Sequence, residues 1–251
     1  MSIHLVGGGW RPDGDADVLG GFLAEAAVRA AGSGRMVPRL GVLLVVPVGA
    51  SDDASANDTP ADGDAPAAFA GAFERVASSL PIVSAVVEGA VFESAVLSDI
   101  DGLVVGGGLA PAYLAAVQPL IDEIRLLVAD GLPYLGYSAG AMIAADRAIV
   151  GGWRVDGVPV CPAETGEDLD ELTIAEGIGL VDLAVDVHAA QWGTLSRLVA
   201  ATEAGLVEGG VAVDEGTVLV VNDDGLRIAG AGNVWRVLDD PAGILVGTLE
   251  A

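Results

Sequence analysis

The 251-residue sequence contains no lysine, and all 11 of its basic residues are arginine. Schiff-base chemistry, pyridoxal attachment and the lysine of a phosphate-binding P-loop are therefore excluded. A single cysteine, Cys161, excludes disulfide frameworks and cysteine-rich zinc sites. The two histidines, His4 and His188, cannot form the H-E-x-x-H motif of metalloproteases. We expect a protein that needs neither a metal nor an organic cofactor.

Long apolar runs are also missing, although 52% of the residues are hydrophobic. No run approaches the roughly 18 residues of a membrane-spanning helix, so we expect no membrane partner. The first five residues lack the basic segment of a signal peptide, which favours a cytoplasmic location. The formal net charge of −25 repels phosphate backbones and argues against nucleic acid as a partner.

Aromatic residues make up only 4% of the chain, so we expect a core of Val, Leu, Ile and Ala side chains. The length falls within the range of one domain, and no internal repeat or linker divides the sequence. We therefore predict a single domain over residues 1–251.

Strands alternate with helices in the first 147 residues. Short aliphatic runs predict strands at 3–6, 41–48, 82–87, 102–105 and 132–137. Apolar residues three and four positions apart predict helices at 15–32, 67–79 and 112–129. This alternation predicts a mostly parallel sheet between layers of helices. Residues 50–65 read as an acidic, solvated loop.

The pattern changes after residue 147. We expect a hairpin at 148–161, an acidic loop at 162–173 and a helix at 191–204. Apolar and polar residues alternate over 180–187, which predicts a half-buried strand. Several short strands follow over 210–249, and we expect them to be antiparallel at the edge of the sheet.

The strongest local signal is Gly136-Tyr137-Ser138-Ala139-Gly140, a G-x-S-x-G pattern between an expected strand and an expected helix. The pattern is typical of a nucleophile elbow, a sharp turn in which only small residues fit beside the serine. The turn exposes the hydroxyl at the carboxyl edge of the sheet. We predict Ser138 as a nucleophile, against the alternative of an ordinary glycine-rich turn.

A serine nucleophile needs a neighbouring base, because its hydroxyl is a poor nucleophile at neutral pH. His4 lies within the first expected strand, so we interpret it as a packing residue. His188 directly follows a strand end, at the edge where α/β sites assemble. We predict His188 as the base, against the alternative of a surface histidine.

Residue type does not identify the acid that would orient the imidazole, because carboxylates are abundant. Glu215 is a candidate, since it stands at an expected strand end before a glycine turn. Each candidate also has an alternative interpretation as solvated surface charge. The competing carboxylates are Asp156, Glu164, Asp186 and Asp214.

Backbone N–H groups for an oxyanion are expected beside the serine. Gly106-Gly107-Gly108 ends the strand that precedes the nucleophile strand, so Gly107 or Gly108 could join Ala139 as a donor. Neither this triplet nor the one at 7–9 forms G-x-G-x-x-G, which argues against dinucleotide binding.

Four stretches of sequence form a recognisable set: V-V-G-G-G at 104–108, G-Y-S-A-G-A at 136–141, D-V-H with a later arginine at 186–198, and V-D-E-G-T at 213–217. Together they resemble the dipeptidase E and cyanophycinase family of serine peptidases. The glycines at 7–9 and the segment 230–234 fit more weakly. The resemblance extends over most of the chain, and its most specific part is G-x-S-A-G-A followed about fifty residues later by D-x-H.

The resemblance implies a flavodoxin-like three-layer α/β/α sandwich, related to class I glutamine amidotransferases, with antiparallel strands near the C-terminus. It also implies Ser138 as nucleophile, His188 as base and Glu215 as acid. This order differs from that of α/β-hydrolases, where the acid precedes the histidine. A class I glutamine amidotransferase would have cysteine at position 138, so the serine indicates hydrolysis.

The sequence departs from the family at positions that contact substrate. Leu109 stands where the family usually has Asn or Gln. Positions where cyanophycinase-like sequences have glutamine or basic residues hold Val187, Trp192 and Thr194. Arg197 remains, and an arginine can bind the carboxylate of the aspartyl substrates that the family favours. We expect Arg197, Gln191 and Leu109 to contact substrate.

We predict a serine hydrolase, an exopeptidase or isopeptidase that cleaves small peptides, with aspartyl-type amides as the class that the resemblance implies. A homodimer is an expected assembly for such a sandwich. One alternative is a carboxylesterase-like hydrolase that uses Asp156 or Asp186 as its acid. The other is a non-catalytic binding protein on the same scaffold.

Overall fold

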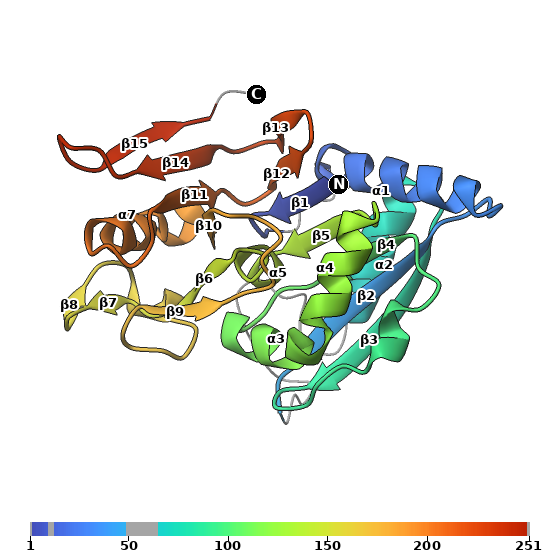
Figure 1. Ribbon diagram of the computed structural model, residues 1–251, viewed down its shortest axis with the longest axis horizontal. Coiled ribbons are helices and arrows are strands. Elements are labelled where there is room, and N and C mark those ends of the chain that lie inside the picture. Colours follow the sequence, from blue (N-terminus) through green and yellow to red (C-terminus); the bar gives the residue numbers. More distant parts are fainter. Residues whose placement is uncertain (1, 10–12, 49–64, 250–251) are drawn as a thin grey trace.

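The computed structural model describes residues 2–9, 13–48 and 65–249. The acidic loop expected at 50–65 therefore lies almost wholly outside the described residues. Two sheets carry most of the strands, and Figure 1 shows them side by side with helices packed against them.

The larger sheet has seven strands in the order β13-β12-β1-β5-β4-β2-β3. Strands β1, β5, β4, β2 and β3 are parallel, whereas β12 pairs antiparallel with β1 and with β13 at one edge. Their bounds are β1 Ser2–Val6, β2 Arg39–Val46, β3 Leu80–Val87, β4 Gly102–Val105, β5 Tyr134–Tyr137, β12 Thr217–Asn222 and β13 Gly225–Gly230. The predicted α/β fold with a mostly parallel sheet is confirmed.

Helices cover both faces of this sheet. Helices α1 (Asp15–Gly32) and α2 (Ala65–Val76) pack on one face, in a core that includes Phe22 and Phe73. Helices α3 (Ala110–Val117), α4 (Ile121–Ala129) and α5 (Ala139–Met142) pack on the other face. No helix among the described residues is long and apolar enough to cross a membrane.

The continuous helix expected at 112–129 is wrong. Helix α3 ends at Val117, a 3-10 turn occupies Gln118–Leu120, and α4 begins at Ile121. Pro119 explains the break, because it has no N–H group and its ring clashes with the carbonyl four residues earlier in a helix. The apolar period continues through the break, so the face toward the core is kept.

The smaller sheet has the strand order β10-β11-β14-β15 and lies beside the edge strands of the larger one. Its strands are β10 Ala184–Val187, β11 Gly209–Val213, β14 Val234–Leu238 and β15 Leu245–Thr248. The segment predicted as one helix at 191–204 forms α6 (Ala189–Trp192) and α7 (Leu195–Glu203). The antiparallel strands expected near the C-terminus thus divide between two sheets.

The hairpin expected at 148–161 is only partly correct. Strand β6 (Arg147–Gly151) pairs with the distant β9 (Thr173–Glu176), whereas β7 (Arg154–Val155) and β8 (Val158–Pro159) form a small hairpin. Two further 3-10 turns span Ser94–Leu97 and Ala163–Thr165. The partner of β6 could not be predicted, because the β7–β8 hairpin and a 3-10 turn separate β6 from β9 in the chain.

The half-buried strand expected at 180–187 is only partly correct. The strand β10 is shorter, and all four of its residues are buried. The alternation misleads because Asp186, interpreted as solvent-facing, is fully buried against Arg197 of α7. A buried carboxylate paired with an arginine therefore occupies a position that the pattern assigns to water.

Two glycine substitutions test the packing of α1 on the sheet. Gly20 lies within α1, and a Cβ atom there would meet nothing within 4 Å. Gly20→Ala should raise the free energy of unfolding by about 0.5–1 kcal/mol, through helix propensity. A Cβ atom on Gly102 of β4 would lie 2.8 Å from the ring of Phe22.

Gly102→Ala should therefore lower the free energy of unfolding by about 1–3 kcal/mol. Urea denaturation monitored by circular dichroism measures both changes. Equal effects of the two variants would contradict this packing.

Candidate active site

Ser138 occupies the turn between β5 and α5. Its backbone has φ +52° and ψ −111°, a strained conformation for a residue with a side chain. A Cβ atom on Gly136 would lie 2.4 Å from the carbonyl oxygen of Gly140, and one on Gly140 would lie 2.2 Å from that of Val105. The turn is therefore as tight as the G-x-S-x-G pattern indicates, and only glycine fits at these two positions.

His188 follows β10 and reaches Ser138 from the smaller sheet. Its Nε2 atom lies 2.9 Å from Ser138 Oγ. The residue has φ +54°, the left-handed conformation. Its ring stacks on Trp192, with ring centroids 4.0 Å apart and planes 12° apart. This stacking restricts rotation of the imidazole ring about the Cβ–Cγ bond of His188.

Glu215 lies between β11 and β12 on the other side of the imidazole. Its Oε1 atom is 3.0 Å from Nδ1 of His188, and its side chain is 22% exposed. The Glu215 N–H donates to Oε1 of Gln191 at 2.9 Å. Gln191 thus contacts the backbone of the glutamate and is itself exposed.

The end of β1 holds all three segments together. Consecutive carbonyl oxygens of Val6, Gly7 and Gly8 accept the N–H groups of Ser138, His188 and Gly216 at 2.9, 3.0 and 2.8 Å. A Cβ atom on Gly8 would lie 1.9 Å from Cε1 of His188. One on Gly9 would lie 2.6 Å from Cβ of Glu215.

The glycine triplet at 7–9, a weak signal in the sequence, is therefore a structural requirement of the site. The sequence does contain a signal for this role. The triplet directly follows a predicted parallel strand, and such a strand ends at the same edge of the sheet as the strand before the serine.

Burial and, to a smaller extent, the Arg197 cation lower the pKa of His188 to about 3. The imidazole is therefore neutral at neutral pH. The Glu215 carboxylate accepts a hydrogen bond and so places the single ring proton on Nδ1. The lone pair of Nε2 then faces the hydroxyl of Ser138, which donates to it.

The other candidate carboxylates either form hydrogen bonds with other groups or lie in exposed turns. Asp186 pairs with Arg197, and Asp214 accepts hydrogen bonds from Ala190 N–H, Trp235 Nε1–H and the amide groups of Asn233. Asp156 is exposed in the turn between β7 and β8, and Glu164 is exposed in a 3-10 turn. The structure thus brings Glu215 to the imidazole and leaves its four competitors elsewhere.

Arg197, which we expected to contact substrate, lies inside the fold. Its side chain is 1% exposed, and its guanidinium donates to both carboxylate oxygens of Asp186 at 2.8 and 2.6 Å. Its remaining Nη1 group donates to the carbonyl oxygen of Thr165 at 2.6 Å. The guanidinium is thus hydrogen-bonded within the fold. The sequence could not show this, because Asp186 of β10 and Thr165 of a 3-10 turn meet α7 only in the folded chain.

The glycine-rich loop after β4 lies beside Ser138. A Cβ atom on Gly107 would lie 3.0 Å from that of Ser138, and Gly106 accepts the N–H of Gly140 at 3.0 Å. Gly108 is exposed, with φ +148°, and Leu109 is half-buried just before α3. Ala139 is the first residue of α5, so its N–H has no partner within that helix.

His4 is a packing residue, in agreement with its sequence interpretation. It is buried in β1, and Nε2 lies within hydrogen-bond distance of Ser2 Oγ and Glu25 Oε2.

The acidic loop expected at 162–173 contains a residue whose role the sequence analysis missed. The side chain of Glu167 in this loop turns inward, and its Oε2 accepts the N–H of Ala110 at 3.0 Å.

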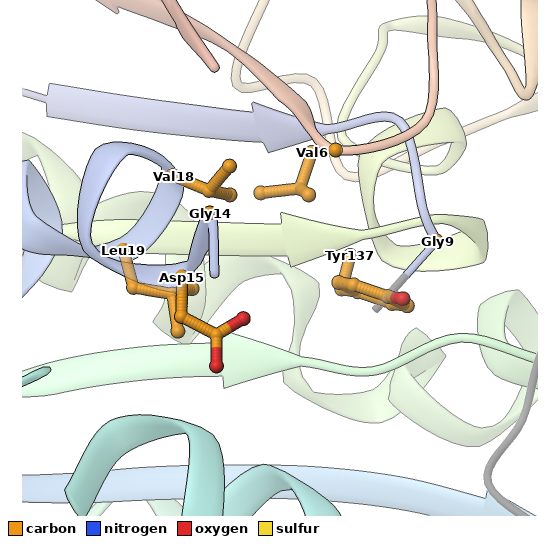
Figure 2. A pocket seen from close by; sticks show the side chains of 8 residues that line it. Val6, Gly9, Gly14, Asp15, Val18, Leu19 and Tyr137 are labelled. Atoms are coloured by element: carbon orange, nitrogen blue, oxygen red, sulfur yellow. The ribbon is translucent and has the colours of Figure 1, made fainter. Parts of the chain in front are cut away.

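A small cavity lies next to the end of β1 (Figure 2). It is lined by Val6, Gly9, Gly14, Asp15, Val18, Leu19, Tyr137 and Gly216. Its volume of about 10 Å³ accommodates about one water molecule, which is too small for a peptide. Within the described ranges, no group of three His, Cys, Asp or Glu side chains could hold a metal ion.

A serine, a neutral histidine and a glutamate in one chain of hydrogen bonds at the carboxyl edge of a parallel sheet are typical of serine hydrolases. The family model described as peptidase family S51 matches residues 72–229. The chain therefore belongs to peptidase family S51.

Two curated cyanophycinases, from Synechococcus elongatus and Thermosynechococcus vestitus, are 34% identical to this chain over 146 residues. The match covers 56% of this chain and 42% of each cyanophycinase. The phosphoribosylformylglycinamidine synthase subunit PurQ of Halobacterium salinarum is 31% identical over 116 residues, which cover 37% of this chain and 52% of PurQ. The chain thus matches only about half the length of these relatives.

Solved structures share the fold over nearly the whole chain. A peptidase from an acI-B1 Actinobacterium superposes with a TM-score of 0.58 at 17% identity, covering 100% of this chain and 94% of that one. A protein assigned as a peptidase E from Listeria monocytogenes EGD-e gives a TM-score of 0.53 at 12% identity, covering 92% and 98%. At these identities the likeness concerns the fold alone.

Removal of the carboxylate that neutralises Arg197 should destabilise the fold. Asp186→Asn leaves a buried guanidinium without a counter-charge and should lower the free energy of unfolding by about 3–5 kcal/mol. Asp122→Asn removes the carboxylate of an exposed pair with Arg125 and should change it by less than about 0.5 kcal/mol. Urea denaturation compares the two, and similar effects would show that the buried pair contributes no more than the exposed one.

Proposed function

We propose that this protein is a serine peptidase with Ser138, His188 and Glu215 as its catalytic residues. The observation that carries the proposal is the position of His188, whose two ring nitrogens contact Ser138 on one side and Glu215 on the other. Membership of peptidase family S51 supports the same reaction class.

In the first step, Ser138 Oγ attacks the carbonyl carbon of the scissile amide while its proton passes to Nε2 of His188. The imidazole becomes charged, and the Glu215 carboxylate stabilises this charge through Nδ1–H. The low pKa of His188 in the resting site means that the imidazole is present as the base at neutral pH.

The carbonyl oxygen becomes an oxyanion, which we assign to the N–H groups of Gly107 or Gly108 and of Ala139. The support is their place: Gly107 lies against Ser138, and Ala139 directly follows it. Backbone donors held by a rigid fold stabilise developing charge without reorganising.

The C–N bond then breaks, and the amine leaves with the proton from Nε2. Water attacks the resulting acyl ester, giving one proton to Nε2. Oγ departs and takes that proton back, which releases the acid and restores the serine. No further reactant is needed.

Short peptides are the substrate class that we propose, cleaved at a terminal bond or at a β-linked aspartyl amide as in the family that the chain resembles. Arg197 does not supply the binding group for an aspartyl carboxylate, because Asp186 and Thr165 already occupy it. Recognition of an acidic substrate would have to use other groups.

A fluorophosphonate probe and a panel of dipeptides test the proposal together. The probe should label the wild type at Ser138, as read by mass spectrometry, and Ser138→Ala should abolish labelling and lower hydrolysis by at least about 10³-fold. The panel should contain aspartyl, β-aspartyl and neutral dipeptides. A folded wild type that is neither labelled nor active would contradict the proposal and favour a binding protein.

The identity of the acid is tested by a matched pair of substitutions. Glu215→Gln keeps the shape of the side chain but removes the charge that stabilises the imidazolium, so kcat should fall by about 10²–10⁴-fold. Asp156→Asn alters an exposed turn and should leave kcat within about twofold of the wild type. A fully active Glu215→Gln variant would contradict the assignment of Glu215 as the acid that stabilises the imidazolium.

A further inference from the structure

Glu167 is a half-buried carboxylate that the proposed mechanism does not use. It lies in the segment between β8 and β9, where Glu167 and Asp168 both have positive φ, at +56° and +59°. Two successive non-glycine residues in this conformation are costly and persist only where the surrounding structure imposes them. A Cβ atom on Gly151 would lie 2.6 Å from Cβ of Glu167, so this glycine makes room for the turn.

The carboxylate of Glu167 caps α3 from a distant part of the chain. The residue before the helix, Leu109, has no side-chain group that could cap it, and the second helical residue is Pro111. Oε2 of Glu167 instead accepts the N–H of Ala110, the first residue of α3, at 3.0 Å. A carboxylate at this end of a helix is stabilised by the helix dipole.

This hydrogen bond fixes one end of the loop that we assign to the oxyanion. The other end is fixed at Gly106, whose N–H donates to Leu43 and whose carbonyl accepts from Gly140, both at 3.0 Å. Between the two anchors lie Gly107, Gly108 and Leu109, and the two glycines have no side chains that could hold them in place. The direction of their N–H groups therefore depends on both anchors.

We propose that Glu167 is a positioning residue of the oxyanion loop, which acts through the N–H of Ala110 to orient the backbone donors at Gly107 and Gly108. The inference rests on the proposed function, because it concerns the same reaction. Glu167 itself does not touch the reacting atoms.

The ionisation of Glu167 makes this role visible in a pH profile. The pKa of Glu167 is raised to about 7 in all: desolvation raises it most, the hydrogen bond from Ala110 and the Arg197 cation lower it, and the Asp186 and Asp168 carboxylates raise it. Above pH 7 the charged carboxylate is the stronger acceptor, and below pH 7 the anchor weakens. The activity therefore falls as the pH drops through 7. Burial and the Arg197 cation lower the pKa of His188 to about 3, well below this range.

The experiment measures kcat and KM between pH 5.5 and 8.5 for the wild type, Glu167→Gln, Glu167→Ala and Glu164→Gln. Wild-type kcat should fall about fivefold with a midpoint near pH 7, as expected for loss of a charge-assisted hydrogen bond. Glu167→Gln keeps a neutral acceptor, so its kcat should show no inflection near pH 7 and should stay close to the low-pH value of the wild type. Glu167→Ala should lower kcat by about a further tenfold, and KM should change by less than about twofold in every variant.

Glu164→Gln, an exposed neighbour in the same segment, should keep the wild-type profile. Thermal melting confirms that each variant is folded. If Glu167→Ala does not fold, the pH profile of Glu167→Gln alone tests the positioning role of Glu167. A Glu167→Gln profile identical to that of the wild type, or an effect confined to KM, overturns this inference and leaves the proposed function standing. A wild type with no activity and no probe labelling overturns both.

Discussion

The backbone of Val6, Gly7 and Gly8 is the constraint on which the candidate active site depends. Three successive carbonyl oxygens at the end of β1 bind the chain at Ser138, at His188 and beside Glu215. These segments come from two different sheets, so no local preference brings them together. Because the glycines have no side chains, the imidazole and the glutamate can approach to a distance that any Cβ atom would prevent.

Buried charge has a second organising role. The pair of Asp186 and Arg197 joins β10 to α7 two residues before His188 in the chain, and Arg197 also binds the carbonyl of Thr165 in the segment that carries Glu167. Two fully buried ions require good geometry, since unpaired they would cost several kcal/mol each. The pair thus connects the histidine segment to the loop that caps α3, which links both sides of the proposed active site.

Much of this architecture could be predicted from the sequence. Aliphatic runs predicted the parallel strands, apolar periods of three and four predicted the helices, and the G-x-S-x-G pattern predicted the tight turn at Ser138. These signals were accurate because each depends on residues that are neighbours in the sequence. Predictions that depended on distant partners were less accurate. The pairing of β6 with β9 and the inward side chains of Asp186 and Glu167 contradicted the local pattern, since a polar residue reads as exposed until its partner is known. The break at Pro119 was missed although its cause is local, because the apolar period continues through it.

The sequence by itself determined which residues can perform chemistry: one serine in an elbow, one histidine at a strand end and a surplus of carboxylates. The absence of lysine and the single cysteine narrowed the choice of reaction class further. Only the tertiary structure decided which carboxylate faces the imidazole and that Arg197 is engaged within the core. The physical reason is that hydrogen-bond partners are selected by distances of about 3 Å, and folding creates those distances between residues far apart in the chain.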